Sequence, residues 1–370
     1  MRNAQVLAIT LLRLFMVNIA ERVPVENLEW EEILASPQFL LHSLNTIEGM
    51  LNFINCDRVR LSQTSFIDGR SSLSSNSTSY TIPLEYALAW HANRNDQDSV
   101  NRFIFHTSFC GSTLMARMLN SKGKVFTYKE PQIFLQLADM QSRQADLCRN
   151  NERWNRLLEF VLSQFSAPWS PGEVNLIKPS NWVNTLICDL LTASDQSKVV
   201  FLSMTAESFL TAVFRGGSER VQYIYNLVHH LKQSLPEYGE LIAHVEQNSE
   251  DTVNLFSRLT LIAHAMQSKC FALSAKMLND RDRYICSYDD LCGSPQSCIK
   301  NVAGTLMINL SDSDIEVSVK QNMQRHSKVI DRSYTRHNAS QTNCAVLSRY
   351  QENFSRALQW KVETLDSMPV

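Results

Sequence analysis

The chain has 370 residues, 44% of them hydrophobic and 19% charged, which is an ordinary balance for a globular protein. This length allows either one large α/β domain or two smaller domains. The formal net charge of −2 argues against non-specific nucleic-acid binding, so we expect no nucleic-acid partner and only local basic sites.

The N-terminal residues 6–20 are largely apolar and follow the basic Arg2, which is a pattern shared with signal sequences. Arg13 interrupts the run, no clean cleavage site follows it, and it is too short to span a bilayer. We therefore interpret it as a core or interfacial helix and expect no membrane association. Nine scattered cysteines without a Cys-x-x-Cys pair favour reduced thiols and hence a cytoplasmic location.

Three regions follow one another along the chain. Residues 1–100 form an N-terminal, mainly helical extension that includes a Ser-rich exposed loop over Gly69–Ser79. Residues 101–340 form an α/β domain, and residues 341–370 form a C-terminal helical tail. These boundaries are predictions from composition and pattern.

Short apolar runs alternate with helical segments from residue 102 onward, which predicts a mostly parallel sheet with crossover helices. The carboxyl ends of parallel strands meet at one edge of a sheet, so we expect the polar residues that follow these runs to converge on one crevice. The five predicted strands are Phe103–His106, Val125–Tyr128, Val174–Lys178, Lys198–Ser203 and Arg283–Ser287.

The turn after the first strand has small residues and opens a helix. A strand, a tight loop and a helix can direct backbone N–H groups at an anion, and hydroxyls can add to them. The alternative is an ordinary strand–helix turn capped by Ser112 or Thr113. No Lys stands where a Gly-x-x-x-x-Gly-Lys-Ser/Thr loop requires it. The loop residues in question are Ser108, Phe109, Cys110, Gly111, Ser112 and Thr113.

Charged residues end the next two predicted strands. Lys129 and Glu130 precede Pro131 and could supply a charge clamp and a general base, or form a solvent-facing pair. Lys178 could contact a phosphate or be a surface charge. We expect Ser180 or Asn181, just after it, to cap the following helix.

Two further segments carry cations that could reach an anion. Thr211 interrupts an apolar helix face, and Arg215 and Arg220 follow it closely. The late cluster Arg325–Lys328 could be a lid that brings cations to a phosphate, and a charged loop is the alternative.

The order of these motifs resembles that of the sulfotransferase family, whose members transfer a sulfuryl group from 3′-phosphoadenosine 5′-phosphosulfate (PAPS). The loop around Gly111 resembles the family's 5′-phosphosulfate loop, and Tyr128–Pro131 is similar to its Glu-Pro strand end. Lys178-Pro179 resembles its Lys-x-Pro, one residue shorter, and Tyr288–Leu291 its Tyr-Glu-Asp-Leu. The resemblance covers about residues 102–335.

The resemblance implies a P-loop NTPase-like three-layer α/β sandwich with a mostly parallel five-stranded sheet. It also implies roles for individual residues: Glu130 as base, Lys129 and Lys178 as charge-stabilising groups, and the Ser108–Thr113 loop as donor site. Further donor contacts fall to Thr211, Arg215 and Lys328. No metal is expected.

Two departures from the family pattern concern positive charge. Phe109 stands where the family loop has Lys or Arg, and Ser203-Met204-Thr205 does not supply the Arg that holds the 3′-phosphate. Lys129 or Lys178 could replace the first charge. Arg215, Arg220 or Lys328 could replace the second.

The leading hypothesis is sulfuryl transfer from PAPS to a hydroxyl or amine of a small-molecule, glycan or peptide acceptor. A non-catalytic nucleotide- or anion-binding protein on the same fold is the alternative. A P-loop kinase or hydrolase is disfavoured by the absent loop Lys and by the lack of an evident Mg²⁺-binding Asp at a strand end. The acceptor and the oligomeric state are not encoded in any motif.

Overall fold

The computed structural model describes residues 28–71, 73, 77–94, 99–144, 148, 151–194, 196–323 and 336–368. The chain divides into two compact units. Unit 1 comprises Met1–Phe103, Asn120–Pro179 and Asp189–Lys198, and unit 2 comprises Ile104–Leu119, Ser180–Cys188 and Val199–Val370. Each unit therefore draws on more than one of the regions predicted from the sequence.

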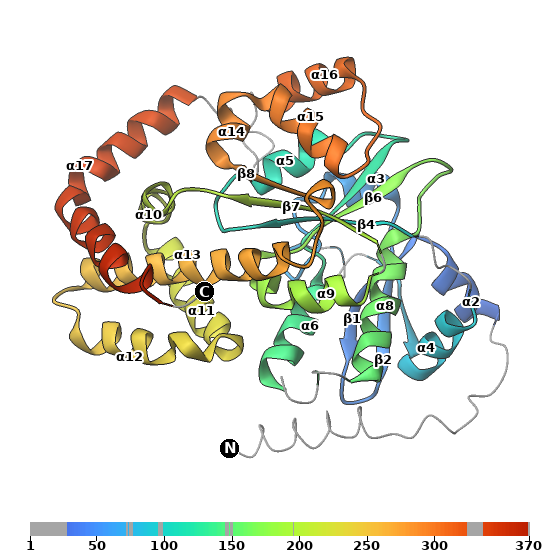
Figure 1. Cartoon of the computed structure of the whole chain (residues 1–370). Helices are drawn as coiled ribbons and strands as arrows, with labels where there is room; N and C mark the ends of the chain where they lie inside the picture. Colours follow the sequence, from blue (N-terminus) through green and yellow to red (C-terminus); the bar gives the residue numbers. More distant parts are fainter. Residues whose placement is uncertain are drawn as a thin grey trace. The chain divides into compact units, whose positions relative to one another are not determined.

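A five-stranded sheet contains all five strands predicted from the sequence, in the order β5-β6-β4-β7-β8 (Figure 1). The pairs β5–β6, β4–β6 and β7–β8 are parallel, which confirms the predicted α/β fold with a mostly parallel sheet. The strands are β4 (Asn101–His106), β5 (Val125–Lys129), β6 (Val174–Lys178), β7 (Ser197–Ser203) and β8 (Arg283–Ser287).

The first strand of this sheet, β4, is its topological switch point. The chain adds β5 and β6 on one side of β4 and then β7 and β8 on the other. In open α/β sheets, ligands bind beyond the carboxyl end of the strand at which the order reverses. The turn after β4 is therefore the position at which this topology favours a ligand.

Buried apolar side chains explain why these segments are strands. All five residues of β5 and the last four of β6 are buried, as expected for parallel strands that are covered on both faces. Phe103, Ile104 and Phe105 of β4 are at most 1% exposed. Burial on both faces replaces the apolar–polar alternation with continuous apolar runs, which made these strands visible in the sequence.

The described part of the N-terminal region contains strands as well as the helices predicted for it. It contains a three-stranded antiparallel sheet, β1-β2-β3, whose strands are Phe39–Asn45, Met50–Asn55 and Ser79–Pro83. The strands alternate with short helices α2 (Leu28–Ala35), α3 (Arg58–Gln63) and α4 (Leu84–Ala92). The apolar residues of these short strands also suit a helical pattern, and only the pairing with neighbouring strands decides between the two.

Helices α6 and α8 cover this part of unit 1. Both contact β1, and Figure 1 shows α6 beside it. Gln136 of α6 accepts the N–H of Leu44 at 2.8 Å. Helix α6 spans Gln132–Arg143 and α8 spans Glu152–Ser166. The short helix α9 spans Ile187–Thr192.

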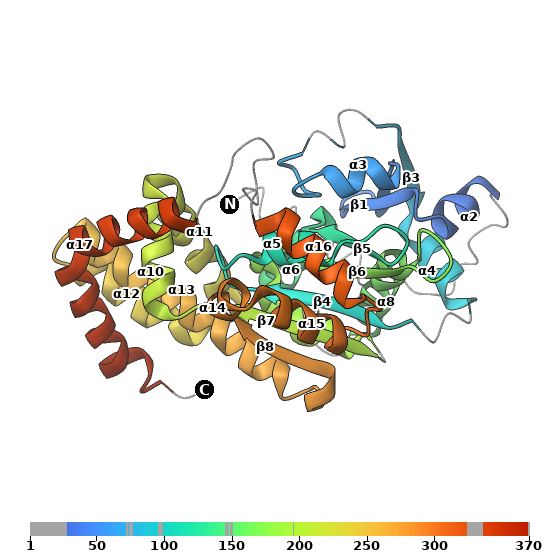
Figure 2. The ribbon, with the colours of Figure 1, turned by 90° about the horizontal axis from the view of Figure 1, so that it is seen from above.

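Unit 2 contains a group of long helices. Figures 1 and 2 show α10, α11, α13 and α17 packed against one another, and α17 begins at Arg336 rather than at the predicted residue 341. Their bounds are α10 (Ala206–Arg215), α11 (Gly217–Ser234), α12 (Gly239–Asn248), α13 (Thr252–Ala275) and α17 (Arg336–Trp360). The other helices of unit 2 are α5 (Ser112–Leu119), α14 (Tyr288–Gly293), α15 (Pro295–Thr305) and α16 (Asp312–Met323).

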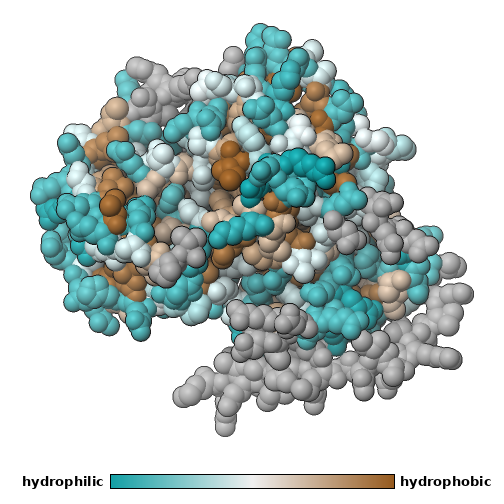
Figure 3. All heavy atoms as spheres, viewed as in Figure 1, coloured by the Kyte–Doolittle hydropathy of each residue, from teal (hydrophilic) through white to brown (hydrophobic). Residues whose placement is uncertain are grey.

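The face drawn in Figure 3 is predominantly hydrophilic, and its hydrophobic residues lie in small separate patches. Within the described ranges, no helix combines the length and the apolar character that crossing a bilayer requires.

Candidate active site

The turn after β4 lies in unit 2 and has an unusual backbone. Phe109 has a φ of 62° and Gly111 a φ of 82°, both in the left-handed region. Helix α5 begins directly afterwards at Ser112, and the carbonyl of Gly111 accepts the N–H of Met115 at 3.0 Å. Left-handed residues before a helix leave several N–H groups pointing out of the turn, which is the geometry of an anion-binding loop.

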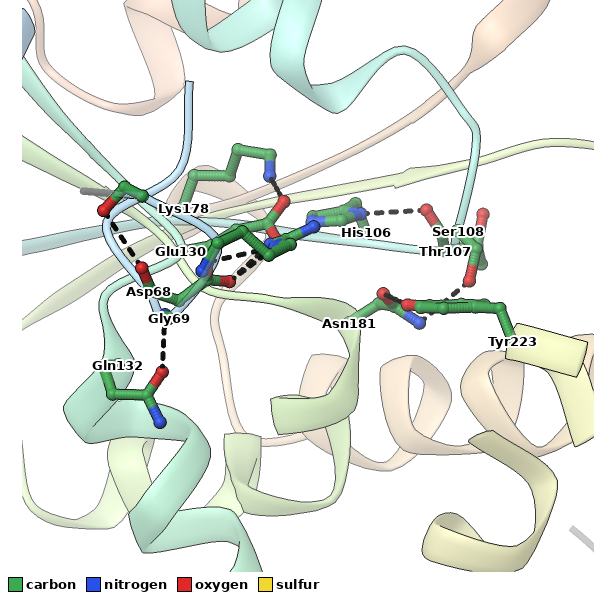
Figure 4. A network of polar contacts seen from close by, with 12 residues as sticks. Asp68, Gly69, His106, Thr107, Ser108, Glu130, Gln132, Lys178, Asn181 and Tyr223 are labelled. Carbon is green, nitrogen blue, oxygen red and sulfur yellow. Dashed lines mark hydrogen bonds and ion pairs between the residues drawn. The ribbon is translucent and has the colours of Figure 1, made fainter. Parts of the chain in front are cut away.

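A buried polar network holds this loop in place (Figure 4). The side-chain amide of Asn181 donates to Ser108 Oγ at 2.9 Å and to Gln267 Oε1 at 3.1 Å, and its oxygen accepts from the hydroxyl of Tyr223. Asn184 donates to the His106 carbonyl at 3.1 Å. Asn181 therefore fixes the loop. Ser180 stands at the N-cap position of the 3₁₀ helix Asn181–Leu186, as one of the two predicted alternatives had it, but no side-chain hydrogen bond caps that helix.

The loop residues fit an anionic ligand in two respects. Thr107 is fully buried, and its Oγ1 has no hydrogen-bond partner in the described part of the chain. Gly111 has a structural reason instead, because a Cβ there would stand 3.1 Å from the ring of Tyr288 and would be strained by the positive φ. The hydroxyls of Ser112 and Thr113 are nearly buried at the start of α5, where the helix dipole favours negative charge. These features suit an anion.

Phe109, which stands in place of the family's loop cation, is covered by an arginine of unit 2. The guanidinium carbon of Arg220 lies 4.5 Å from the centroid of the Phe109 ring. Tyr223 contacts the same ring edge-on, with centroids 5.5 Å apart. Burial and, to a lesser extent, the neighbouring Arg215 lower the pKa of Arg220 to about 10, so it remains charged at neutral pH.

Two of the other residues predicted to contact the donor, Thr211 and Arg215, lie on α10. Thr211 is buried, and its hydroxyl donates to the Glu207 carbonyl at 2.9 Å within the helix. Arg215 donates to Asn343 Oδ1 of α17 at 2.7 Å. The cluster Arg325–Lys328, which ends with the predicted donor contact Lys328, lies outside the described residues.

Glu130 and Lys178 form a buried ion pair in unit 1 (Figure 4). Strands β5 and β6 place them together, because Lys129 and Lys178 are register partners at the carboxyl ends of the two strands. The Lys178 side chain has 0% exposure and that of Glu130 has 8%. The sequence therefore correctly places Glu130 and Lys178 at adjacent strand ends, while their catalytic roles remain predictions.

A second cation, Arg70, pairs with the other oxygen of Glu130. Arg70 also bonds the carboxylate of Asp68 through Nε, at 2.9 and 3.0 Å, and stacks over the Phe66 ring. Burial alone would lower the pKa of Arg70, but the bonds to Asp68 and Glu130 raise it above its ordinary value. Both oxygens of the predicted base are thus paired, one with a fully buried ammonium and one with a half-exposed guanidinium.

Lys129 is bound within unit 1, and its predicted charge-stabilising role remains a prediction. Its ammonium donates to the Ser62 carbonyl at 2.7 Å and so ties β5 to the end of α3. The side chain is 3% exposed. This bond gives Lys129 a structural task in unit 1.

Sequence reasoning missed Asp68 and Arg70, because they belong to or border a Ser-rich segment that was predicted to be an exposed loop. A carboxylate two residues before an arginine is the only local signal, and it does not point to Glu130. Tyr223 and Gln267 were also missed, since they lie 42 and 86 residues from Asn181. Within the described ranges, no three His, Cys, Asp or Glu side chains are grouped as metal ligands.

The sheet and the turn after β4 define a P-loop-like α/β protein. Its solved structural neighbours include the sulfotransferase domain from the curacin biosynthetic pathway (12% identity, TM-score 0.39, covering 70% of this chain and 96% of that one). The sulfotransferase domain of the Synechococcus PCC 7002 olefin synthase is similar at 13% identity and TM-score 0.39 (75% and 98% covered). Sulfotransferase STF1 from Mycobacterium tuberculosis H37Rv is similar at 11% identity and TM-score 0.39 (94% and 92% covered).

No protein-family model matches the chain, and no curated protein matches it. The similarity to solved sulfotransferases is remote, with identities of 11–13% in the three structures above. The activity must therefore be argued from this chain's own residues.

Proposed function

We propose that this protein transfers a sulfuryl group from a PAPS-type donor to a hydroxyl or amine of an acceptor molecule. The observation that carries the proposal is the turn after β4, where two left-handed residues and the start of α5 form an anion loop at the switch point of the sheet. The N–H groups of Cys110–Thr113 would bind the 5′-phosphosulfate, together with the hydroxyls of Ser112 and Thr113.

The proton of the acceptor would be taken by a carboxylate of unit 1. An acceptor O–H or N–H would give its proton to Glu130 while its oxygen or nitrogen forms the new bond to sulfur. The bond between sulfur and the 5′-phosphate oxygen breaks, and its electron pair stays on the phosphate, so that 3′-phosphoadenosine 5′-phosphate leaves. Lys178 would stabilise the carboxylate and the developing charge.

Arg70 limits how an acceptor can reach Glu130 in this mechanism. It occupies one oxygen of Glu130 and comes from a half-exposed position, whereas Lys178 is fully buried. An acceptor group that approaches Glu130 from the solvent would therefore meet Arg70 before Lys178, and would bond to a second lone pair of the carboxylate or take the place of Arg70.

The donor assignment is tested by calorimetry with 3′-phosphoadenosine 5′-phosphate. We expect micromolar affinity, and an affinity no better than millimolar would contradict the assignment. Turnover is tested separately with radiolabelled donor and a set of alcohol, phenol and amine acceptors, in which labelled product should form only when protein is present.

A non-catalytic binding protein on the same fold is the second candidate, since both oxygens of Glu130 are paired and the loop has Phe109 instead of a cation. It predicts nucleotide binding without transfer to any acceptor and without slow release of sulfate from the donor. The two functions are separated by assaying binding and turnover on one preparation.

A further inference from the structure

Arg220 of α11 occupies a defined position in unit 2. Its guanidinium lies over the Phe109 ring, 4.5 Å from the centroid, and one of its terminal nitrogens donates to the Ala212 carbonyl. Phe109 itself is held in the left-handed conformation within the turn after β4. The guanidinium of Arg220 therefore stacks on Phe109, the residue that stands where the family loop has Lys or Arg.

Gly216 makes room for this arginine. A Cβ added at Gly216 would stand 2.0 Å from Cδ, 2.3 Å from Cγ and 2.4 Å from Nε of Arg220. The φ of Gly216 is −85°, which any residue can adopt, so backbone conformation does not require glycine here. The glycine is explained by the space that the Arg220 stem occupies, and the arginine is therefore packed in one orientation.

In the part of the chain that the structure describes, the charged neighbour that affects Arg220 is another cation. Arg215 is close enough to lower the pKa of Arg220, and it donates to Asn343 rather than to a carboxylate. Within the described ranges, the side-chain hydrogen-bond partners of the two arginines are neutral: Asn343 Oδ1 for Arg215 and the Ala212 carbonyl for Arg220. Two neighbouring cations that are partly buried repel each other, and an anion bound between them would remove that repulsion.

We propose that Arg220 supplies the positive charge that the loop lacks at Phe109, and that it binds the 5′-phosphosulfate end of the donor. This inference rests on the proposed function and goes beyond it, because it assigns the missing charge to α11 and not to Lys129 or Lys178. During transfer, the S–O bond to the 5′-phosphate breaks, and Arg220 stabilises the negative charge that collects on the phosphate oxygen.

The matched alternative is an arginine that only stacks on an aromatic ring. Arg220→Met keeps the aliphatic stem over Phe109 and removes the charge. We expect it to weaken binding of 3′-phosphoadenosine 5′-phosphate by about tenfold or more, while binding of adenosine 3′-monophosphate, which lacks the 5′-phosphate, stays unchanged. A purely structural arginine would change both affinities equally or neither, and either result overturns the proposal.

Two further variants test the same proposal in case Arg220→Met does not fold. Gly216→Ala leaves Arg220 in the chain but displaces its stem, and it should reproduce the selective loss. Phe109→Lys in the Arg220→Met background returns a cation to the loop and should restore at least part of the affinity for the bisphosphate. Arg281→Met is the control, because that side chain is 85% exposed on another part of unit 2.

Inorganic pyrophosphate separates this inference from the proposed function. In one outcome, the wild-type protein does not bind the bisphosphate nucleotide but binds pyrophosphate, and Arg220→Met abolishes that binding. The donor assignment is then wrong, and the anion site of Arg220 is confirmed. If pyrophosphate binding is absent, or is the same in both proteins, while the nucleotide also fails to bind, both are wrong.

Discussion

Lys178 and Glu130 are joined twice, once through their side chains and once through their backbones. The ammonium of Lys178 pairs with Oε1 of Glu130, and the N–H of Glu130 donates to the Lys178 carbonyl at 2.7 Å. The backbone bond continues the pairing of β5 with β6, and Glu130 adopts a left-handed φ of 57°, which is uncommon for a residue with a Cβ. A strained backbone that is held by a buried ion pair is a feature of functional sites.

We expect Lys178→Met to destabilise the protein, because it removes the fully buried cation from the Glu130 carboxylate and leaves the half-exposed Arg70. Breaking a buried ion pair by removing one partner costs about 3–5 kcal/mol, and Arg70 should keep the loss near the lower end of that range. Urea unfolding measures it. The control is Arg143→Met, which breaks an exposed helical pair with Asp139 and should cost about 0.5 kcal/mol or less. Equal losses in the two variants would contradict this account of the pair.

Glu130→Gln tests the proposed base separately from donor binding. The amide keeps the shape of the side chain but accepts no proton, so turnover should fall by about 100-fold or more. Affinity for 3′-phosphoadenosine 5′-phosphate should not change, since the donor contacts are assigned to unit 2. Undiminished turnover would remove Glu130 as the base.

Gly111→Ala should damage the anion loop in two ways. The positive φ of 82° strains any residue with a Cβ, and the new methyl group would press on the Tyr288 ring, so we expect a loss of about 1–2 kcal/mol in stability. Donor binding should weaken as well. Gly123→Ala shares a positive φ of 76° but has open space around it, so it reports the backbone strain alone. If both variants bind the nucleotide like the wild type, the loop does not hold the donor.

His264 predicts a loss of stability in mild acid. Burial lowers the pKa of His264, and the hydrogen bond that its Nε2 donates to the Met204 carbonyl partly opposes this shift. Of two smaller effects, Lys361 lowers the pKa and Asp366 raises it. The unfolded chain then binds the proton more readily, so the contribution of His264 is present above pH 6.5 and is lost as pH falls below it. The loss is limited to about 1.4 kcal/mol per pH unit for one proton.

The matching variant is His264→Gln, whose amide can still donate to Met204. Its melting temperature should fall less than that of the wild type between pH 7 and pH 5.5. His42, whose pKa burial also lowers while Asp68 opposes the shift, remains in both proteins and accounts for a shared residual slope. A parallel pH dependence in the two proteins would show that His264 does not contribute.

The sheet was predictable because its physical cause is local. Strands such as Val125–Lys129 and Val174–Lys178 are buried on both faces and therefore read as continuous apolar runs ended by charged residues. The three-stranded sheet of residues 39–83 was not predictable in the same way. Its short strands carry mixed patterns, and only cross-strand pairing distinguishes them from helix.

The sequence by itself determined the order of the α/β elements, the loop over residues 107–113 and the strand ends that carry Glu130 and Lys178, since each depends on neighbouring residues. Only the tertiary structure decided which charges meet. Arg70 reaches Glu130 across 60 residues, and Arg220 reaches Phe109 across more than 100. Contacts of that kind depend on how helices and strands pack, and a pattern of adjacent residues contains no record of them.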